Sequence, residues 1–229
     1  MTEAIDSLKN IVVSDFNYFK DWYGFNFKIE ENLSERQLEE VFNVCRRDIF
    51  DILSKSECSK TMLRKNLLSI LGLSNIVNYD IAGEVVRLAI TNKELIKSAM
   101  IISGAIFWHQ EIAKIISKKE LTVLQNFIGE NTYSFVVKRG MMLWKMVPPL
   151  ERIFSKTETL AKQIRETGKA ILCRALFGIP DEIKKRFELV FDEKFDIPKE
   201  CDEVLFKKCF ALIKFSLERV SMDKVKHEE

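Results

Sequence analysis

The sequence predicts an all-α protein, a single compact domain of about eight or nine helices with an irregular, aromatic-rich N-terminal arm. Three observations support this fold class. Apolar residues make up 47% of the 229 residues and charged residues 31%, as is typical of a globular protein. All four prolines lie after residue 147, so the longer first part of the chain contains few helix breakers. Apolar residues recur at three- and four-residue spacing, as on the buried face of a helix.

The arm, residues 1–33, contains many aromatic side chains that follow no clear period. One interpretation is an irregular segment packed on the core. The other is an exposed docking segment, because aromatic anchors are enriched at the hot spots of protein interfaces. The candidate partner-binding residues are Phe16, Phe19, Trp22, Tyr23 and Phe25.

The all-helical body, residues 34–223, begins with a helix-start signal. Residues 34–37, Ser-Glu-Arg-Gln, match the S-x-x-Q capping box, in which the serine and the glutamine each satisfy a free backbone amide. The apolar spacing that follows predicts an amphipathic helix through Leu53. A second helix is expected over 60–71 and ends at Gly72, where a left-handed cap favours glycine. A third is expected over 76–90.

The most apolar helix is expected in the middle of the fold. It opens at a second capping box, Thr91 to Glu94, and continues through Trp108 and His109 to about Ile116. A helix that is apolar nearly all round belongs in the interior.

Further helices are expected on both sides of a proline-containing turn. A third capping box over 117–120 starts a helix that ends at Gly129, and another begins near residue 131. The turn, and with it a subdomain break, is expected near 146–150, because a residue before proline avoids helical geometry.

The last part of the chain should contain three more helices. The first extends from residue 150 toward 177 and stops at Gly178, and the second starts at Pro180, since proline is favoured in a first helical turn. After a loop at 192–198, the third covers about 199–220, and residues 224–229 form a frayed tail.

Charge and cysteine content argue against several functions. Thirty-six basic against 34 acidic residues give a net charge of +2, too balanced to indicate a nucleic acid as the main partner. A helical nucleic-acid binder that uses Lys184-Lys185-Arg186 is therefore a weak alternative. The five cysteines are an odd set without a C-x-x-C pair, so we expect reduced thiols, no metal and no cofactor. They are Cys45, Cys58, Cys173, Cys201 and Cys209.

Neither export nor membrane insertion is expected. Residues 1–10 include Glu3 and Asp6 and lack the basic start and apolar run of a secretion signal. The most apolar stretch, residues 99–108, is too short to span a membrane, which takes roughly twenty residues. We expect a cytoplasmic protein that reaches a membrane only through protein partners.

The candidates for catalysis are few. There are two histidines, and His227 lies in the tail, which leaves His109. Its favoured interpretation is a hydrogen-bonded structural histidine. Nucleotide-binding, zinc-protease and calcium-loop motifs are absent from the sequence. We therefore expect no enzyme and no catalytic residues. The alternative is a small helical enzyme or ligand-binding protein with a polar-lined pocket near Trp108 and His109.

Two blocks of sequence resemble the SctK/YscK family, the accessory cytosolic proteins of the type III secretion sorting platform. In the first, a small-residue helix, Ile102-Ser103-Gly104-Ala105, precedes Lys118-Lys119-Glu120-Leu121-x-x-Leu124-x-x-Phe127-Ile128-Gly129-Glu130-x-x-Tyr133-x-Phe135-x-Val137-x-Arg139. The second is Gly168-x-x-x-Leu172-x-x-x-Leu176-x-Gly178-Ile179-Pro180-x-x-Ile183-x-x-Arg186-x-x-Leu189.

The resemblance implies an all-helical, non-catalytic adaptor on the cytosolic side of the bacterial inner membrane. Its expected partners are the forkhead-associated cytoplasmic domain of the SctD-like inner-membrane ring protein and the SctQ-like pod protein, which the adaptor would join. The resemblance supplies no catalytic, cofactor or metal residues.

Overall fold

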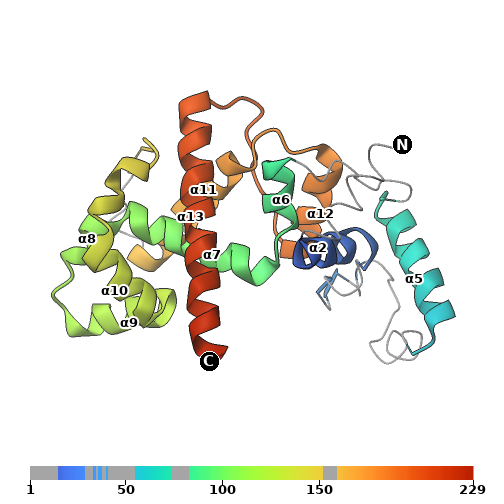
Figure 1. Ribbon diagram of the computed structural model, residues 1–229, viewed down its shortest axis with the longest axis horizontal. Helices are drawn as coiled ribbons and strands as arrows, with labels where there is room; N and C mark the ends of the chain where they lie inside the picture. Colours follow the sequence, from blue (N-terminus) through green and yellow to red (C-terminus); the bar gives the residue numbers. More distant parts are fainter. Residues whose placement is uncertain are drawn as a thin grey trace. The chain divides into compact units, whose positions relative to one another are not determined.

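The computed structural model describes residues 15–28, 33–34, 36–37, 40, 55–73, 83–151 and 159–228. These residues form ten α-helices and one 3-10 helix and contain no strand (Figure 1), which confirms the predicted all-α class. The chain divides into two compact units. Unit 1 comprises Met1–Asn92 and Ile179–Lys194, and unit 2 comprises Lys93–Gly178 and Phe195–Glu229. The boundaries expected at residue 33, near 146–150 and at 224 stay predictions.

The aromatic N-terminal segment of unit 1 is a regular helix, α2 (Phe16–Phe27), and not the irregular conformation that we expected over these residues. Asp15 caps it, since its carboxylate accepts a hydrogen bond from the Tyr18 amide at 3.1 Å. Tyr18, Trp22 and Phe25, spaced four and three residues apart, are buried. Aromatic residues on both faces of the helix hid this helical period in the sequence.

The capping box at residues 34–37 is confirmed. The Gln37 amide donates to Ser34 Oγ at 3.2 Å, and the Ser34 amide donates to Gln37 Oε1 at 2.8 Å. The same two side chains bind the end of α12 (Asp181–Phe191): Gln37 Nε2 donates to the Leu189 carbonyl at 2.9 Å, and Ser34 Oγ donates to Asp192 Oδ2 at 3.1 Å. The helix predicted from here through Leu53 lies outside the described residues.

Two more helices belong to unit 1. Helix α5 (Glu57–Ile70) is followed by Gly72 with φ 65°, the left-handed conformation predicted there. Leu63 and Leu67 of α5 form an apolar cluster with Leu73. Helix α6 (Glu84–Ile90) begins later than the start expected near residue 76, because Gly83 at its N-cap is extended. The helix predicted to start at Pro180 begins one residue later, at Asp181, and Pro180 is its N-cap. Its first turn contains Asp181 and Glu182, which favour the positive end of the helix dipole.

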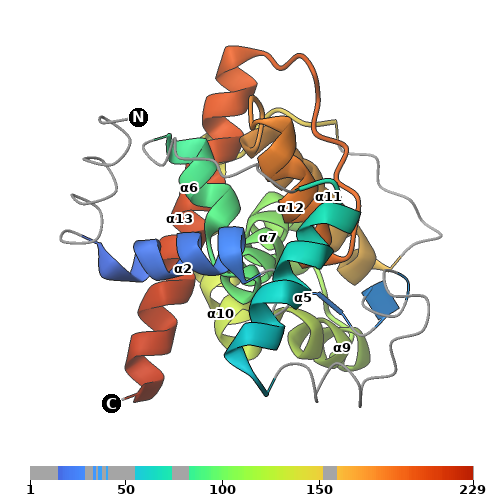
Figure 2. The same cartoon turned by 90° about the vertical axis from the view of Figure 1, so that its right-hand side faces the viewer.

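Three helices pack against one another in the interior of unit 2 (Figures 1 and 2): α7 (Lys93–Phe107), α11 (Leu160–Ala175) and α13 (Glu203–Glu228). The backbones of α7 and α11 touch. A Cβ atom added to Gly104 would lie 2.0 Å from the Ile164 carbonyl oxygen, and one added to Gly168 would lie 2.1 Å from the Met100 carbonyl oxygen. Only glycine permits this approach.

The contact of α7 with α13 includes a buried polar pair. The hydroxyl oxygens of Ser103 and Ser216 lie 2.8 Å apart. Each also lies 2.8 Å from a carbonyl of its own helix, that of Ala99 or Leu212. One hydroxyl donates to the other, which in turn donates to the carbonyl of its own helix, so both groups have a polar partner in the apolar interior.

The central helix is shorter than predicted. It ends at Phe107, and a separate short helix, α8 (His109–Ala113), follows Trp108. The Thr91 hydroxyl donates to the Arg87 carbonyl at 2.9 Å, and α7 begins at Lys93, so Thr91 does not form the predicted capping box.

The next helices of unit 2 follow the prediction closely. Helix α9 (Lys118–Ile128) is capped by Ser117, whose hydroxyl accepts from the Glu120 amide, and it ends at Gly129 with φ 85°. Helix α10 (Glu130–Arg139) and the 3-10 helix η2 (Met142–Met146) come next.

Two later helices begin after their predicted starts because a polar cap decides the position. Helix α11 begins at Leu160 and not near residue 150, since the Thr159 hydroxyl accepts from the Lys162 amide at 3.4 Å. Helix α13 begins at Glu203, since the Asp202 carboxylate accepts from the Leu205 amide at 3.0 Å. Among the described helices, none is apolar over a length that could cross a membrane.

Candidate interaction surfaces

One face of α2 exposes aromatic side chains; we define the aromatic face as Phe16, Phe19, Tyr23 and Phe27. Phe16 is 63% exposed and Tyr23 is 40% exposed. Ring centroids lie 6.5 Å apart for Phe16 and Phe19, 6.4 Å for Phe19 and Tyr23, and 5.3 Å for Tyr23 and Phe27. The rings therefore form a continuous ridge.

The structure divides the predicted partner-binding residues into two groups. Phe16, Phe19 and Tyr23 lie on the aromatic face, whereas Trp22 and Phe25 are only 4% and 6% exposed and belong to the core. Phe27, which was not among the candidates, extends the face. The helical period of the segment would have separated the two groups had a helix been assumed.

The buried side of α2 is fixed by two arginines. The Arg87 guanidinium of α6 lies 4.5 Å from the centroid of the Tyr18 ring, a cation–π contact. Arg186 of α12 donates from Nη1 to the Asn26 carbonyl at 3.1 Å. Burial lowers the pKa of Arg186 and, on α2 itself, raises the pKa of Asp21. Arg186 is 2% exposed and cannot serve in the basic patch considered for nucleic acid.

Trp108 and His109 are both packed in the interior of unit 2. The Trp108 indole donates to Thr167 Oγ1 at 2.8 Å. His109 is 7% exposed, with Nδ1 hydrogen-bonded to the Ile106 carbonyl at 3.1 Å and its ring centroid 5.5 Å from that of Trp144. A Cβ atom at Gly140 would lie 2.6 Å from His109 Cβ. These contacts give His109 the structural role that the sequence favoured.

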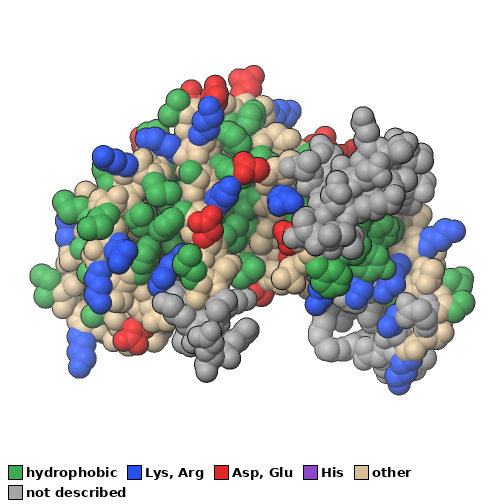
Figure 3. Space-filling model, in the orientation of Figure 1, with side chains coloured by type: hydrophobic (Ala, Val, Ile, Leu, Met, Phe, Trp, Pro, Cys, Tyr) green, Lys and Arg blue, Asp and Glu red, His purple; other side chains and the backbone are tan. Residues whose placement is uncertain are grey.

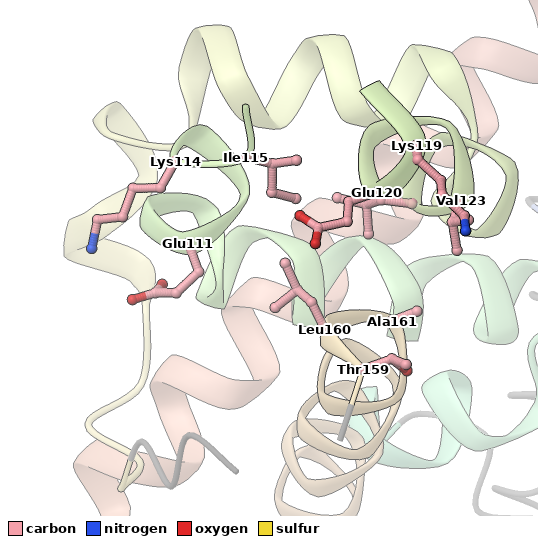
Figure 4. A pocket seen from close by; sticks show the side chains of 10 residues that line it. Glu111, Lys114, Ile115, Lys119, Glu120, Val123, Thr159, Leu160 and Ala161 are labelled. Atoms are coloured by element: carbon pink, nitrogen blue, oxygen red, sulfur yellow. The ribbon is translucent and has the colours of Figure 1, made fainter. Parts of the chain in front are cut away.

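A cavity of about 630 Å³ lies between α8, α9 and the start of α11 (Figure 4). This volume is within the range of sites that bind small ligands, roughly 300–1,000 Å³. Its lining residues are Glu111, Lys114, Ile115, Lys119, Glu120, Val123, Leu124, Thr159, Leu160 and Ala161. We call this the α8–α9–α11 cavity.

The polar groups of the α8–α9–α11 cavity are unevenly placed. In Figure 4 the Glu120 carboxylate points to the space between Ile115 and Leu160, whereas the Lys114 ammonium points away from it. The cavity thus places the Glu120 carboxylate beside the apolar side chains of Ile115 and Leu160, and its lining also includes Glu111, Lys114 and Lys119. The sequence does not predict this cavity, because its walls come from segments more than thirty residues apart in the chain.

Unit 2 also exposes large apolar side chains outside its core. Figure 3 shows hydrophobic side chains gathered on the visible face of this unit, between Lys and Arg side chains. The exposed large apolar residues of unit 2 are Ile116, Val123, Phe127, Val137, Met141, Met142, Trp144, Val204 and Met222. Apolar patches of this kind are common where proteins bind one another.

Metal-ligand and thiol chemistry have little support in the described residues. In this part of the chain no group of His, Cys, Asp and Glu is arranged to hold a metal ion. Burial raises the pKa of the Cys173 thiol to about 11 and that of Cys209 to about 12. A buried, protonated thiol is a poor nucleophile.

Helical packing in both units and apolar helix faces left exposed define an all-helical protein of the kind that associates with other proteins. The model of the family YOP proteins translocation protein K (YscK) matches residues 23–215. The chain therefore belongs to the YscK family and is a component of type III secretion. Comparisons with curated proteins and with solved structures give no match.

The matched region contains the α8–α9–α11 cavity and both blocks of sequence that resemble the family. It begins within α2, so Phe16, Phe19 and Trp22 lie outside it, whereas Tyr23 lies inside.

Proposed function

We propose that this protein is a non-catalytic, cytoplasmic adaptor of a type III secretion sorting platform, peripheral to the inner membrane. It links the cytoplasmic domain of an SctD-like inner-membrane ring protein to an SctQ-like pod protein. The observation that carries the proposal is the YscK family match over residues 23–215.

The exposed apolar side chains support a mechanism in which the adaptor holds two partner proteins together. An adaptor needs at least two separate contact surfaces, and exposed apolar side chains occur in both units: Phe16 and Tyr23 in unit 1, Val123 and Phe127 in unit 2. A stable interface buries about 800 Å² on each partner, an area that one helix face and its neighbours can supply.

We assign one of the two contact surfaces to the aromatic face of α2. Its buried side is held by Arg87 and Arg186, so the exposed rings stand on a fixed helix. Rigid aromatic side chains lose little conformational entropy on binding and are enriched at hot spots. The same reasoning removes Trp22 and Phe25 from the contact surface, because both are core residues.

Affinity purification of the tagged full chain from its native cell, with mass spectrometry of the co-purified proteins, tests the proposal. We expect an SctD-like ring protein and an SctQ-like pod protein. A preparation that contains neither contradicts the adaptor function.

Paired variants test the aromatic face in the same experiment. The double substitution Phe16→Glu and Tyr23→Glu should remove one partner and leave the other. The control is Met62→Glu with Ile70→Glu, two apolar residues of α5 in the same unit that are 64% and 57% exposed. Retention of both partners by the aromatic-face variant would contradict this assignment.

A further inference from the structure

The apolar lining of the α8–α9–α11 cavity continues onto the outer surface of α9. Val123 lines the cavity and is 57% exposed. Phe127, four residues later on α9, is 39% exposed, and Ile116, just before the helix, is 97% exposed. Residues four apart share a helix face, so the apolar surface extends beyond the cavity along the helix.

This extent favours an elongated occupant over a small molecule. An amphipathic helix in an apolar groove contacts it with side chains at positions i, i+3 or i+4, and i+7. The cavity can take one such side chain, and the surface at Val123 and Phe127 can take the next.

The charge of the cavity specifies the occupant further. The Glu120 carboxylate points between Ile115 and Leu160 (Figure 4). Within the described part of the chain, no ion pair joins this carboxylate to a Lys or Arg side chain. A carboxylate beside apolar walls complements a Lys or Arg, whose methylene stem packs on the walls while its charged end reaches the acid.

We propose that the α8–α9–α11 cavity docks an amphipathic helix of a protein partner. The helix inserts a Lys or Arg whose methylene stem packs on Ile115 and Leu160 and whose charged end pairs with Glu120. An apolar residue one turn away packs on Val123 and Phe127. The cavity defines the chemistry of the docked segment and not the identity of its protein. The inference therefore goes beyond the proposed adaptor function and can fail or succeed separately from it.

Site-specific photo-crosslinking in the native cell tests the proposal. A benzophenone amino acid replaces Val123 in the full chain, and the matched control replaces Val204 of α13, which is 59% exposed in the same unit. We expect a crosslink at position 123, but not at 204, to a peptide of another protein that has an apolar residue and a Lys or Arg three or four positions apart.

Charge reversal then tests the pairing with Glu120. Glu120→Lys should lower the crosslink yield about ten-fold, because like charges now face each other. Replacing the partner's Lys or Arg by Glu should restore the yield. Glu130→Lys, an exposed residue at the start of α10, is the matched control and should change little. Unchanged circular dichroism and melting temperature show that each variant is folded.

Several outcomes overturn the proposal: no crosslink at 123 above that at 204, a crosslink only to lipid or to a second copy of this chain, or a yield that Glu120→Lys leaves unchanged. A crosslink to a basic amphipathic helix of a protein outside the secretion system supports the docking site, and the adaptor function is then decided by the affinity purification alone.

Discussion

Two regions of the molecule differ in how much of their apolar surface is buried: the crossing of α7 and α11 in unit 2, and helix α2 in unit 1. At the crossing, Gly104 and Gly168 bring two backbones into contact, and the interior is closed. In α2, aromatic side chains occupy both faces of one helix, and Phe16 and Tyr23 remain in contact with solvent. The first arrangement stabilises the fold, whereas the second leaves apolar area that a partner can bury.

The largest predicted effect tests the glycine crossing. A Gly104→Ala substitution should lower the free energy of unfolding by roughly 3 kcal/mol or more, because the new methyl group overlaps the Ile164 carbonyl. Denaturant unfolding followed by circular dichroism measures the change.

The matched control is Gly24→Ala in α2, where nothing lies within 4 Å of the added Cβ. It should stabilise the protein by about 0.5–1 kcal/mol, since alanine favours a helix. Equal changes in the free energy of unfolding for Gly104→Ala and Gly24→Ala would contradict the difference between the α7–α11 crossing and α2.

Removing the buried guanidinium of Arg186 should have the next largest effect. Arg186→Met takes away the hydrogen bond to the buried Asn26 carbonyl and should cost about 1–3 kcal/mol. Thermal melts compare this variant with Lys185→Met, which changes an exposed neighbour. A loss no larger than that of Lys185→Met would show that Arg186 does not hold α2.

The serine pair of unit 2 should contribute less to the free energy of unfolding than the Arg186 guanidinium does. Ser103→Ala or Ser216→Ala should each cost about 1 kcal/mol, because one buried hydroxyl loses a partner. The double variant should cost less than the sum of the two, since both single substitutions remove the same hydrogen bond. Strict additivity in a double-mutant cycle would argue against a direct interaction.

The smallest expected effect is on the chemical labelling of the cysteine thiols. At pH 8, an aromatic disulfide reagent should label Cys58, which is exposed in unit 1, and leave Cys173 and Cys209 of unit 2 unlabelled in the folded protein. Peptide mapping identifies the labelled sites. Rapid labelling of Cys173 or Cys209 at a rate near that of Cys58 would show that the interior of unit 2 opens.

The pKa shifts of these two thiols also set a pH dependence. Burial raises the pKa of Cys173 to about 11 and that of Cys209 to about 12, so their protonated forms stabilise the folded state. This contribution is complete below the pKa of an unfolded thiol, about 8.5, and is lost as the pH rises through 11 to 12.

The sequence predicted several helix ends that a local signal sets: the caps at Ser34 and Ser117 and the glycine stops at Gly72, Gly129 and Gly178 form as expected. Other local signals were misjudged, because Thr91 does not cap α7 and the caps at Thr159 and Asp202 were missed. The prediction also failed where another segment decides: the central helix breaks at Trp108, whose indole binds Thr167 of α11.

The candidate interaction surfaces, too, could be predicted from the sequence only in part. The aromatic residues of α2 were identified from the sequence, but their division between core and surface needed the helix to be known. The α8–α9–α11 cavity could not be predicted, because it forms only when the start of α11 packs beside α8 and α9.

Reconstitution from purified components tests whether this chain links the pod protein to the ring protein. The full chain, the SctQ-like pod protein and the cytoplasmic domain of the SctD-like ring protein of one secretion system are mixed, and the mass of the complex is measured by light scattering after size exclusion. We expect a complex of all three that disappears when this chain is omitted. A complex of pod protein and ring domain that forms equally well without it would contradict the adaptor function.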